Sequence, residues 1–347
     1  MASVKYELGN YEFKLKEFFP DNIFEKITDI RVNNPQIILK EAESRKKRKT
    51  LTKDGKLTIL AADHPARMVT KSGDEPIAMG NRQEYLGRVL RVITAGESVD
   101  GVMGTTDIIE DLFIVNYLVK KAGGPSFLDE KVILGSMNRG GLAGAIFEMD
   151  DTMTCWTVDS IRKLGLDGAK VMVRLEPGNY DSAKTLLYMA NVVTELNKYE
   201  IPSFIEPLYV SKEGYKVVKT TNELVKVIGV ASALGDSSRN TWLKIPYAEN
   251  FETVAKATTC PILLLGGESK GDPTGTMMEF INGLKAGKNV RGALVGRNIL
   301  YPGKDDPATV ALAVNNIVHS GLSYDSAVEF LMKNRGKGID VLAKYIK

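Results

Sequence analysis

The chain has 347 residues, of which 44% are hydrophobic and 26% are charged, a composition typical of a globular protein with one large domain or two small ones. Its 46 Lys and Arg residues nearly balance its 43 Asp and Glu residues, so the charge does not favour a nucleic acid or a membrane surface as a partner. The first residues contain no apolar signal segment, and no apolar run approaches the length of a membrane span. We therefore expect a cytoplasmic protein with neither a nucleic-acid nor a membrane partner.

Two residue types that often bind metals are scarce. Cys155 and Cys260 lie far apart in the sequence and form no C-x-x-C pair, so they indicate neither a disulfide framework nor a zinc knuckle. His64 and His319 are the only histidines, too few for the His-rich zinc site of metal-dependent aldolases and hydrolases. An all-oxygen Mg²⁺ site stays open, but we expect no metal and no other cofactor.

The first 50 residues precede the regular part of the chain. Residues 21–30 space their apolar side chains at three and four, which predicts an amphipathic helix. After Asn34 and Pro35, residues 37–49 predict a second, polar helix. The basic run at residues 45–49 is predicted to be the solvated end of that helix.

From Lys56 onward, short apolar runs alternate regularly with helical patterns. The predicted strands are residues 57–62, 101–104, 132–135, 169–175, 203–206, 242–245, 262–265 and 293–295. The predicted helices between them are residues 82–93, 108–121, 158–164, 182–199, 222–234, 251–256, 277–285 and 308–318, with two extra C-terminal helices at 324–331 and 339–345.

Eight strand–helix units with nearly continuous apolar strands predict an α/β fold, a (β/α)₈ TIM barrel. We expect the barrel at residues 51–347 and an N-terminal helical extension at residues 1–50. A doubly wound open sheet is the alternative. Against it, the first strand is followed by Asp63 and His64 rather than by a Gly-x-Gly-x-x-Gly turn that would bind a dinucleotide.

Polar side chains occur where several predicted strands end, and a parallel barrel places its active site there. They are Asp63 and His64 after the first strand, Ser136, Asn138 and Arg139 after the third, Lys170 and Arg174 on the fourth, Glu206 on the fifth and Lys244 on the sixth. Any single one could be a solvated charge at the rim. For Asp63, Lys170, Glu206 and Lys244 together, that explanation requires several coincidences.

Lys244 is the only charge in a short apolar run that Pro246 closes, which predicts a buried strand. A buried ammonium tends to lose its proton and become a nucleophilic amine, whereas a strand-end lysine can also extend to solvent. At about 6 Å and an effective dielectric near 20, a nearby Lys170 would repel Lys244 by on the order of 3 kcal/mol, or about 2 pKa units. This pattern predicts imine chemistry, with Glu206 as acid and base and Asp63 orienting Lys170 or the substrate.

The last two predicted strands are followed by glycine-rich turns. Gly266 and Gly267 follow the seventh strand, and Gly296 and Arg297 follow the eighth. Barrels commonly bind phosphate at these two loops, through backbone N–H groups and a nearby cation. We therefore expect a phosphorylated substrate.

Six of these segments carry a family resemblance when they are considered in order, namely residues 61–65, 165–174, 204–207, 242–246, 261–267 and 295–297. They resemble the class I, Schiff-base aldolases of the DeoC/LacD type, and the resemblance extends from about residue 57 to about residue 301. The strongest likeness, which includes residues 135–144 and 148–151, is to a branch associated with myo-inositol catabolism. The resemblance implies Lys244 as the imine-forming lysine, Glu206 as the acid and base, Lys170 as the neighbouring cation and Asp63 as the acidic residue that ends the first strand.

The resemblance implies a carbon–carbon lyase that cleaves or forms a bond in a phosphorylated keto-sugar or keto-acid, with 2-deoxy-5-keto-gluconate 6-phosphate as one candidate. We expect His64, Asn138 and Arg174 to bind substrate together with the glycine-rich loops. His64 occupies a position where tagatose-bisphosphate aldolase usually has glutamine, and the chain has a long N-terminal extension that this enzyme lacks. Both departures bear on the substrate. Glu176 replaces an aromatic residue of archaeal-type fructose-bisphosphate aldolases, so a tyrosine acid is not available at this position.

Two other functions remain open. The same lysine could serve a thiolase-like acyl transfer, which would depend on coenzyme A. A barrel that binds a sugar phosphate without turnover is the other alternative, because a fold does not fix a function. In each case we expect a homo-oligomer.

Overall fold

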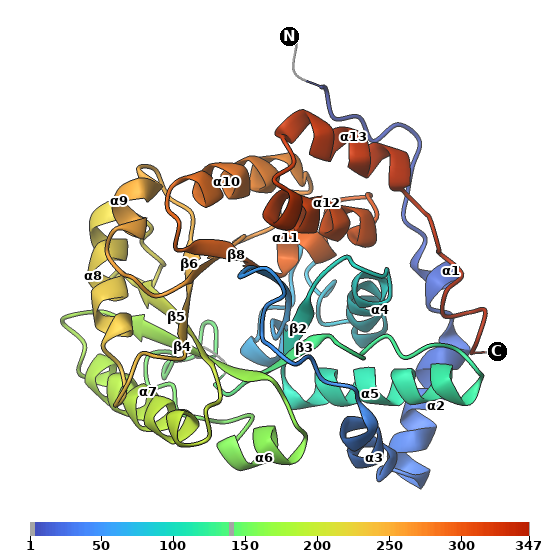
Figure 1. The fold of residues 1–347 in the computed structure, drawn as a ribbon, viewed down its shortest axis with the longest axis horizontal. Helices are drawn as coiled ribbons and strands as arrows, with labels where there is room; N and C mark the ends of the chain where they lie inside the picture. The colour runs from blue at the N-terminus through green and yellow to red at the C-terminus, as the bar shows by residue number, and fades with distance from the viewer. Residues whose placement is uncertain (1–3, 139–141, 347) are drawn as a thin grey trace.

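Eight parallel strands close into a barrel in the computed structural model, which describes residues 4–138 and 142–346 (Figure 1). Each strand pairs with the next one in the chain, and β1 pairs with β8. The strands are β1 (Leu57–Ala62), β2 (Gly101–Gly104), β3 (Val132–Ser136), β4 (Gly168–Leu175), β5 (Ser203–Tyr209), β6 (Thr241–Pro246), β7 (Ile262–Leu265) and β8 (Val290–Val295). The predicted (β/α)₈ barrel is therefore confirmed.

Helices form a ring around the strands (Figure 1). They are α4 (Arg82–Ile93), α5 (Thr106–Lys121), α6 (Val158–Lys163), α7 (Tyr180–Lys198), α8 (Thr221–Ser232), α9 (Phe251–Ala255), α10 (Thr274–Lys285) and α12 (Pro307–Ser320). Three further elements are the 3₁₀ turn η1 (Pro65–Arg67), α11 (Arg297–Leu300) and α13 (Tyr324–Asn334). All eight predicted barrel helices are present, with small differences at their ends.

The second predicted C-terminal helix, at residues 339–345, is wrong. This segment forms successive turns after α13. Gly336 and Gly338 both have positive φ angles, which end the helical path, and the Arg91 side chain binds the carbonyl oxygens of Lys337 and Gly338. The apolar spacing in this segment thus reflects packing of turns against the core, with Leu342 and Ile346 buried.

The interior of the barrel is an apolar plug at its N-terminal end. The inward-facing side chains of this plug are Leu57, Ile59, Ala61, Met103, Val132, Leu134, Phe204, Leu263 and Leu294. The strand residues that alternate with them pack against the helices in the larger outer core. Because side chains two apart share a face, the next inward positions after Ala61, Leu134 and Phe204 are Asp63, Ser136 and Glu206. The polar side chains therefore lie directly on top of the plug.

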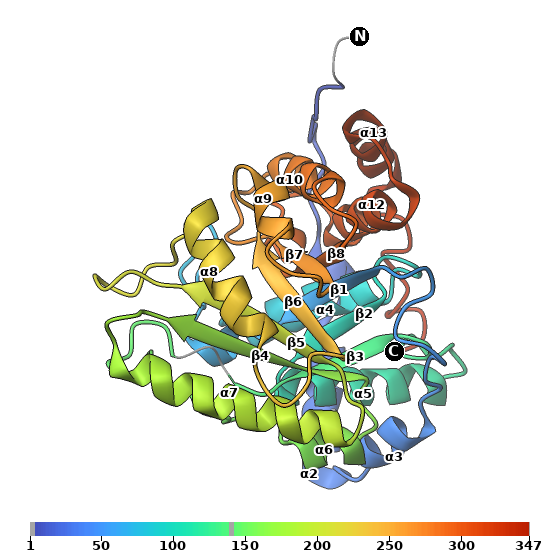
Figure 2. The ribbon, with the colours of Figure 1, turned by 60° about the vertical axis from the view of Figure 1, so that its left-hand side comes forward.

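The N-terminal extension contains α1 (Leu15–Phe18), α2 (Asp21–Asn33) and α3 (Ile37–Ser44). Figures 1 and 2 both show α2 and α3 beside α5. Arg31 on α2 binds the Asp111 carboxylate on α5, at 3.0 Å through Nε and 2.7 Å through Nη2. Before α1, the Tyr6 hydroxyl donates to Asp305 at 2.8 Å. The extension thus packs against barrel helices and against the C-terminal part of the chain, while a domain boundary at residue 50 stays a prediction.

The basic run at residues 45–49 was predicted as a solvated helix end, which is wrong for the helix and for Arg45, although Lys46, Lys47 and Lys49 are exposed. Helix α3 ends at Ser44, and Arg45 is buried. Its guanidinium donates to the carbonyl oxygens of Lys131 and Gly165 at 2.8 and 2.7 Å and to Asp167 at 3.0 Å. A buried guanidinium is tolerated when most of its donors are paired in this way, and only the Arg45 Nε atom is buried without a partner in the described chain. The run therefore fastens the extension to the N-terminal end of the barrel.

Candidate active site

Four charged side chains form a continuous series of contacts at the carboxyl end of the barrel. The Lys244 ammonium on β6 donates to Oε2 of Glu206 on β5 at 2.9 Å. The same Oε2 atom lies 3.0 Å from Nζ of Lys170 on β4. Lys170 also donates to Oδ2 of Asp63, directly after β1, at 3.1 Å. Positive and negative groups alternate along this series, and all four residues are buried.

The two lysines differ in how their charge is supported. Burial disfavours both ammonium ions, but the carboxylates of Asp63 and Glu206 outweigh it at Lys170 and raise its pKa. At Lys244, burial and the charge of Lys170 outweigh the carboxylates of Glu206 and the more weakly acting Asp63, and the pKa is lowered. Because both Nζ atoms contact one carboxylate oxygen, they lie within about 6 Å of each other. Lys244 is therefore the lysine that loses its proton more readily.

Both carboxylates are ionised at neutral pH. Burial acts to raise the pKa of Glu206, but Lys170 and Lys244 outweigh it and lower the pKa to about 2. At Asp63, burial is likewise outweighed by Lys170, and the pKa lies well below its usual range. The Ser136 hydroxyl donates a further hydrogen bond to Asp63 at 3.1 Å. Asp63 is therefore fixed against β3 and β4, whereas Glu206 joins the two lysines.

His64 lies beside the end of β8. A Cβ atom on Gly296 would come within 2.4 Å of His64 Cε1, so only glycine allows the ring to approach so closely. The ring nitrogen Nδ1 lies 3.3 Å from the Tyr85 hydroxyl. Burial lowers the pKa of His64 to about 3. The imidazole is therefore neutral under physiological conditions and can offer a substrate either a donor or an acceptor.

The Asn138 side chain forms its hydrogen bonds with other protein groups in this structure. Its Oδ1 accepts from the Met172 N–H at 2.8 Å, and its Nδ2 donates to the Met172 carbonyl oxygen at 2.6 Å and to Asp151 at 2.7 Å. The side chain thus joins the end of β3 to β4. Its expected contact with substrate stays a prediction. Arg139, the next residue, lies outside the described residues.

The loops after β7 and β8 lie next to each other. The Asn298 side chain donates to the Gly266 carbonyl oxygen at 2.9 Å, and Gly267 has a φ of +74° that favours glycine. Arg297 contacts the exposed Glu268 carboxylate at 3.3 Å, and its Nε atom is buried without a partner in the described chain. A cavity of about 450 Å³ adjoins Arg297 and Glu268. This arrangement can accept an anion, which would compete with Glu268 for the guanidinium.

Sequence reasoning missed Arg67. This residue ends η1, the short turn that Pro65 begins directly after β1, and its charge lowers the pKa of Asp63, His64 and Glu206, although in each case burial is the larger influence. The one available signal was a Pro that starts a turn at the end of a barrel strand. Arg174 was expected here, but not its ion pair with Glu148 from the β3–α6 segment.

The described residues contain no group of three or more His, Cys, Asp or Glu side chains placed to hold a metal ion. Cys155 and Cys260 are both free thiols. Among the helices of residues 4–138 and 142–346, none is long and apolar enough to cross a membrane.

A closed parallel barrel with charged side chains at its carboxyl end places the chain in a class of (β/α)₈ proteins that includes aldolases. The chain belongs to the Cgl0159-like family, whose model matches residues 55–318. It is similar to the crystal structure of Cgl0159 from Corynebacterium glutamicum, with 38% sequence identity and a TM-score of 0.79 over 87% of this chain and 98% of that one.

More distant relatives are aldolases and a synthase. An uncharacterized aldolase from Saccharolobus solfataricus is 29% identical over 185 residues, which are 51% of this chain and 63% of that protein. The 2-amino-3,7-dideoxy-D-threo-hept-6-ulosonate synthase 1 of Archaeoglobus fulgidus is 22% identical, over 82% of this chain and 95% of that protein. An archaeal fructose-1,6-bisphosphate aldolase, with its catalytic lysine bound to a carbinolamine intermediate, shares the fold at 20% identity and a TM-score of 0.54, over 81% of this chain and 99% of that one.

Proposed function

We propose that the protein is a class I aldolase that cleaves or forms a carbon–carbon bond through a Schiff base on Lys244. The observation that carries this proposal is the buried Lys244 ammonium, which shares the Glu206 carboxylate with Lys170 and has a lowered pKa. A lowered pKa increases the fraction of neutral amine at physiological pH, and neutral amine is the form that attacks a ketone.

The first half of the reaction forms the imine. The Lys244 ammonium passes one proton to the ionised Glu206 carboxylate, 2.9 Å from Nζ, and the neutral amine attacks the substrate carbonyl carbon. A second proton moves from the attacking nitrogen to the carbonyl oxygen, which gives the carbinolamine. Glu206 then donates the proton that it took from Lys244 to the carbinolamine hydroxyl, which leaves as water. The product is a positively charged iminium. The low pKa of Glu206 keeps the carboxylate ionised and available to accept a proton, and loss of the Lys244 charge raises this pKa, so that the carboxyl can hold the proton until the hydroxyl takes it.

The second half breaks the carbon–carbon bond. Glu206, or a water that it holds, removes the proton from the hydroxyl beta to the iminium carbon. The oxygen electrons form the aldehyde carbonyl, the bond electrons move into the iminium, and an enamine remains on Lys244. Protonation of the enamine carbon and hydrolysis by one water release the ketone and restore the lysine. This sequence requires no cofactor.

Lys170 and Asp63 assist these steps without forming a covalent bond. Lys170 stays protonated between two carboxylates, and its positive charge adds to burial in lowering the pKa of the neighbouring Lys244. Asp63 holds Lys170 at 3.1 Å and can also orient a substrate hydroxyl. The roles of the two lysines are therefore unequal.

The substrate of this proposal is a phosphorylated keto-sugar or keto-acid. Arg297 and the loops that contain Gly266, Gly267 and Gly296 would bind the phosphate group, because an unpaired guanidinium N–H and backbone N–H groups suit its oxygens. The inositol-pathway resemblance makes 2-deoxy-5-keto-gluconate 6-phosphate a specific candidate, cleaved to dihydroxyacetone phosphate and malonate semialdehyde. A borohydride-trapping screen of ketose phosphates and keto-acid phosphates would identify the accepted compound.

Substitution of Lys244 tests the proposal. Lys244→Met should lower cleavage of the accepted substrate by at least about 10³-fold, because no other side chain can take the place of the covalent amine. Lys256→Met is a matched control, since Lys256 is a surface lysine paired with Glu252. Full activity of Lys244→Met would exclude the mechanism. Ligand binding without turnover in the wild type would favour a non-catalytic barrel, and a strict need for coenzyme A would favour acyl transfer.

A further inference from the structure

Arg174 lies across the barrel mouth from the expected phosphate loops. It is on β4, on the same face as Lys170 and Met172, and so it points toward the interior. In a closed barrel of eight strands, β4 is four strands away from β8 in either direction, and Figure 1 shows the two strands on opposite sides. Arg297 follows β8 directly. The two arginines therefore face the mouth from opposite sides, and Lys244 on β6 lies midway between them.

The Arg174 guanidinium is buried but incompletely paired. The residue is only 6% exposed, and its Nε atom has no hydrogen-bond partner within the described part of the chain. Arg67 Nε is likewise buried without a partner, and Arg67 forms no salt bridge with any described residue. Burial and, to a smaller extent, the charge of Arg67 lower the pKa of Arg174 to about 10. The Arg67 carbonyl oxygen accepts from the N–H of Ala143, in the same β3–α6 segment that holds Glu148, at 3.0 Å. One buried and one half-buried cation with unused donors at this place are unfavourable unless an anion binds between them.

We propose that Arg174 and Arg67 form a second anion-binding subsite, so that the substrate carries an anionic group at each end. One end would be the phosphate held at the β7 and β8 loops, and the other a carboxylate or phosphate on the aldehyde-derived half. This inference rests on the proposed function, because the reacting ketone must reach Lys244 between the two ends. It assigns specificity for the aldehyde to Arg174 and Arg67.

Glu148 occupies part of this subsite in the protein alone. Its Oε1 atom contacts Nη1 of Arg174, and its other oxygen accepts from the Gly144 N–H at 3.3 Å. Glu148 belongs to a β3–α6 segment in which Ile146 is 98% exposed. Glu148 itself is buried, so a substrate anion that takes its place on Arg174 exchanges one charge-assisted contact for another. Glu148 therefore competes with the ligand for Arg174.

The synthetic direction of the reaction tests this subsite directly. With dihydroxyacetone phosphate as donor, kcat/KM is measured for three aldehydes of equal chain length, one with a carboxylate, one with a phosphate and one uncharged. The wild type should prefer at least one anionic aldehyde over the uncharged one by about 10-fold or more. Arg174→Gln and Arg67→Gln should reduce this preference by about 10- to 100-fold, and Glu148→Gln should increase it. Whether the carboxylate or the phosphate aldehyde is preferred identifies the anion.

Arg297→Gln is the matched control, because it should raise the KM of the phosphorylated donor and leave the aldehyde preference as in the wild type. Equal use of charged and uncharged aldehydes by the wild type, or a preference that survives Arg174→Gln, would overturn the subsite while the aldolase activity stands. Absence of any condensation or trapping would instead overturn the proposed function.

A binding measurement without turnover keeps the subsite testable in that case. Inorganic phosphate and malonate should raise the melting temperature of the wild type, because they bind at both anion sites. Arg297→Gln should keep the part of this rise that comes from the Arg174 subsite, and Arg174→Gln should lose that part. Identical shifts in the wild type and in Arg174→Gln would overturn the subsite.

Discussion

At the scale of single residues, the chemistry depends on which of two carboxylates each of two lysines contacts. Lys170 contacts Asp63 and Glu206, whereas Lys244 contacts Glu206. The lysine with two anionic neighbours keeps its proton, and the lysine with one loses it more readily. The charge of Lys170 thus acts on the reaction through the pKa of Lys244.

Replacement of Lys170 should therefore change the pH profile as well as the rate. Lys170→Ala removes the repulsive charge, so the pKa of Lys244 should rise and the neutral amine at pH 7 should fall by on the order of 100-fold. Borohydride trapping should be slow at neutral pH and recover as the pH is raised. Lys170→Arg keeps the charge and should restore part of the neutral-pH rate. An unshifted profile in Lys170→Ala would show that Lys170 does not control Lys244.

Arg297 gives a second prediction at this scale. Arg297→Ala should raise the KM for the accepted phosphorylated substrate by about 10-fold or more, because a charge-assisted contact to phosphate is lost. Glu268→Gln should lower the same KM, since Glu268 contacts the Arg297 guanidinium at 3.3 Å. Steady-state kinetics of the two variants would measure both effects. An unchanged KM in Arg297→Ala would remove the phosphate assignment.

The sequence predicted the candidate residues better than it predicted their contacts. Lys244, Glu206 and Asp63 could be found because each is a charge that ends or interrupts an apolar strand, and a barrel brings strand ends together. The contact of both lysines with one Glu206 oxygen could not be predicted, because it depends on the side-chain rotamers of the two lysines. Arg67 was missed because it lies on a short turn and not on a strand.

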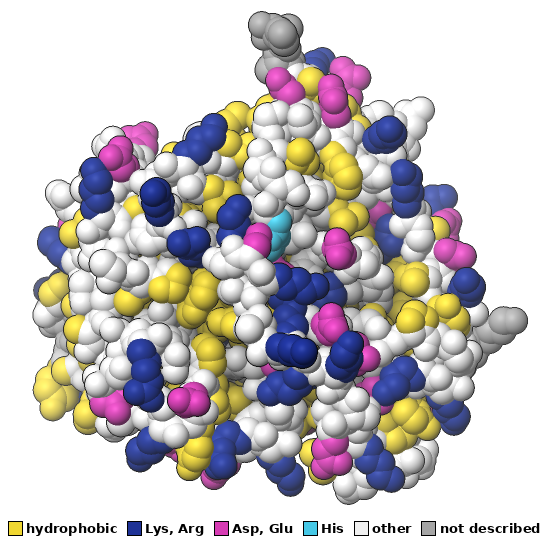
Figure 3. All heavy atoms as spheres, viewed as in Figure 1, with side chains coloured by type: hydrophobic (Ala, Val, Ile, Leu, Met, Phe, Trp, Pro, Cys, Tyr) yellow, Lys and Arg dark blue, Asp and Glu magenta, His cyan; other side chains and the backbone are white. Residues whose placement is uncertain are grey.

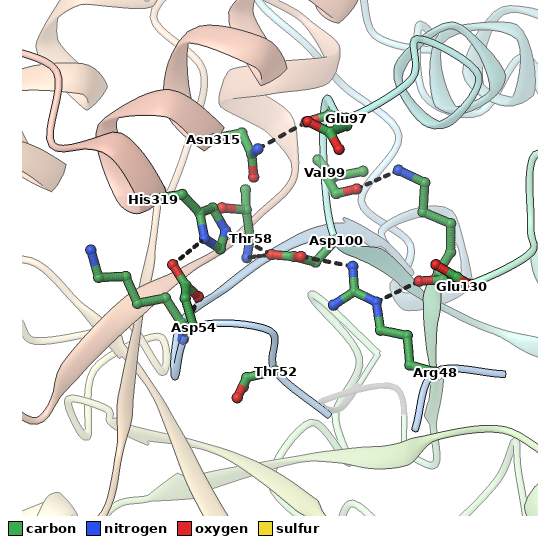
Figure 4. A network of polar contacts seen from close by, with 12 residues as sticks. Arg48, Thr52, Asp54, Thr58, Glu97, Val99, Asp100, Glu130, Asn315 and His319 are labelled. Atoms are coloured by element: carbon green, nitrogen blue, oxygen red, sulfur yellow. Dashed lines mark hydrogen bonds and ion pairs between the residues drawn. The ribbon is translucent and has the colours of Figure 1, made fainter. Parts of the chain in front are cut away.

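At the scale of elements, a polar network joins several segments at the N-terminal end of the barrel (Figure 4). Asp100, before β2, accepts from the β1 backbone at Thr58, from Arg48 and from His319 on α12, at 2.8, 2.8 and 2.9 Å. The other His319 nitrogen lies 2.9 Å from Asp54. Figure 3 shows Lys and Arg side chains gathered in the middle of one face of the molecule. Within the network, a cavity of about 320 Å³ is lined by Arg48, Lys53 and Lys131.

This network should make stability depend on pH. Burial would lower the pKa of His319, but Asp100 and Asp54 outweigh it and raise the pKa. The contribution of His319 is therefore fully present below its unfolded pKa of about 6.5 and lost as the pH rises through the folded value. Burial would raise the pKa of Asp100, but His319, the Thr58 N–H and Arg48 lower it to about 2, so its contribution is present above the unfolded pKa and lost as the pH falls toward 2.

His319→Gln should accordingly lower the free energy of unfolding by about 1–3 kcal/mol at pH 6 and by clearly less at pH 9. Urea denaturation of the wild type and the variant at both pH values would measure the difference. His64→Gln is a control, because burial keeps His64 neutral throughout this range and its effect should not vary with pH. An equal loss at pH 6 and pH 9 in His319→Gln would contradict the assignment of charge to His319.

The elements themselves were predictable, but this network was not. Strands and helices follow from local periodicity, which is why all eight units were found. The contacts of Arg45 and Arg48 instead depend on carbonyl groups and carboxylates that come from distant segments. The order of residues within 45–49 does not distinguish buried arginines that bind distant segments from a solvated helix end.

At the scale of the whole molecule, the two ends of the chain pack together. The backbone N–H of Val4 donates to Asp325 on α13 at 2.8 Å, and the Phe13 N–H donates to the Lys304 carbonyl oxygen at 2.9 Å. Phe18 and Phe19 of the extension are fully buried. The extension therefore covers apolar surface of the barrel helices.

Deletion of residues 1–48 should lower the melting temperature, because it exposes this apolar surface and removes the Arg45 contacts. Thermal unfolding monitored by circular dichroism would measure the change, and light scattering would show whether the mass in solution falls. Arg45→Met in the full chain measures the loss of the Arg45 contacts alone, separately from the exposure of apolar surface. Unchanged stability and unchanged mass after the deletion would show that the extension is an independent appendage.

Covalent trapping measures the central assignment most directly. The wild-type protein is reduced with borohydride in the presence of the accepted ketose phosphate or keto-acid phosphate, digested and analysed by mass spectrometry. The predicted result is one adduct on the peptide that contains Lys244, formed equally in EDTA and absent from Lys244→Met. An adduct on Lys170, or an adduct that persists in Lys244→Met, would contradict the account.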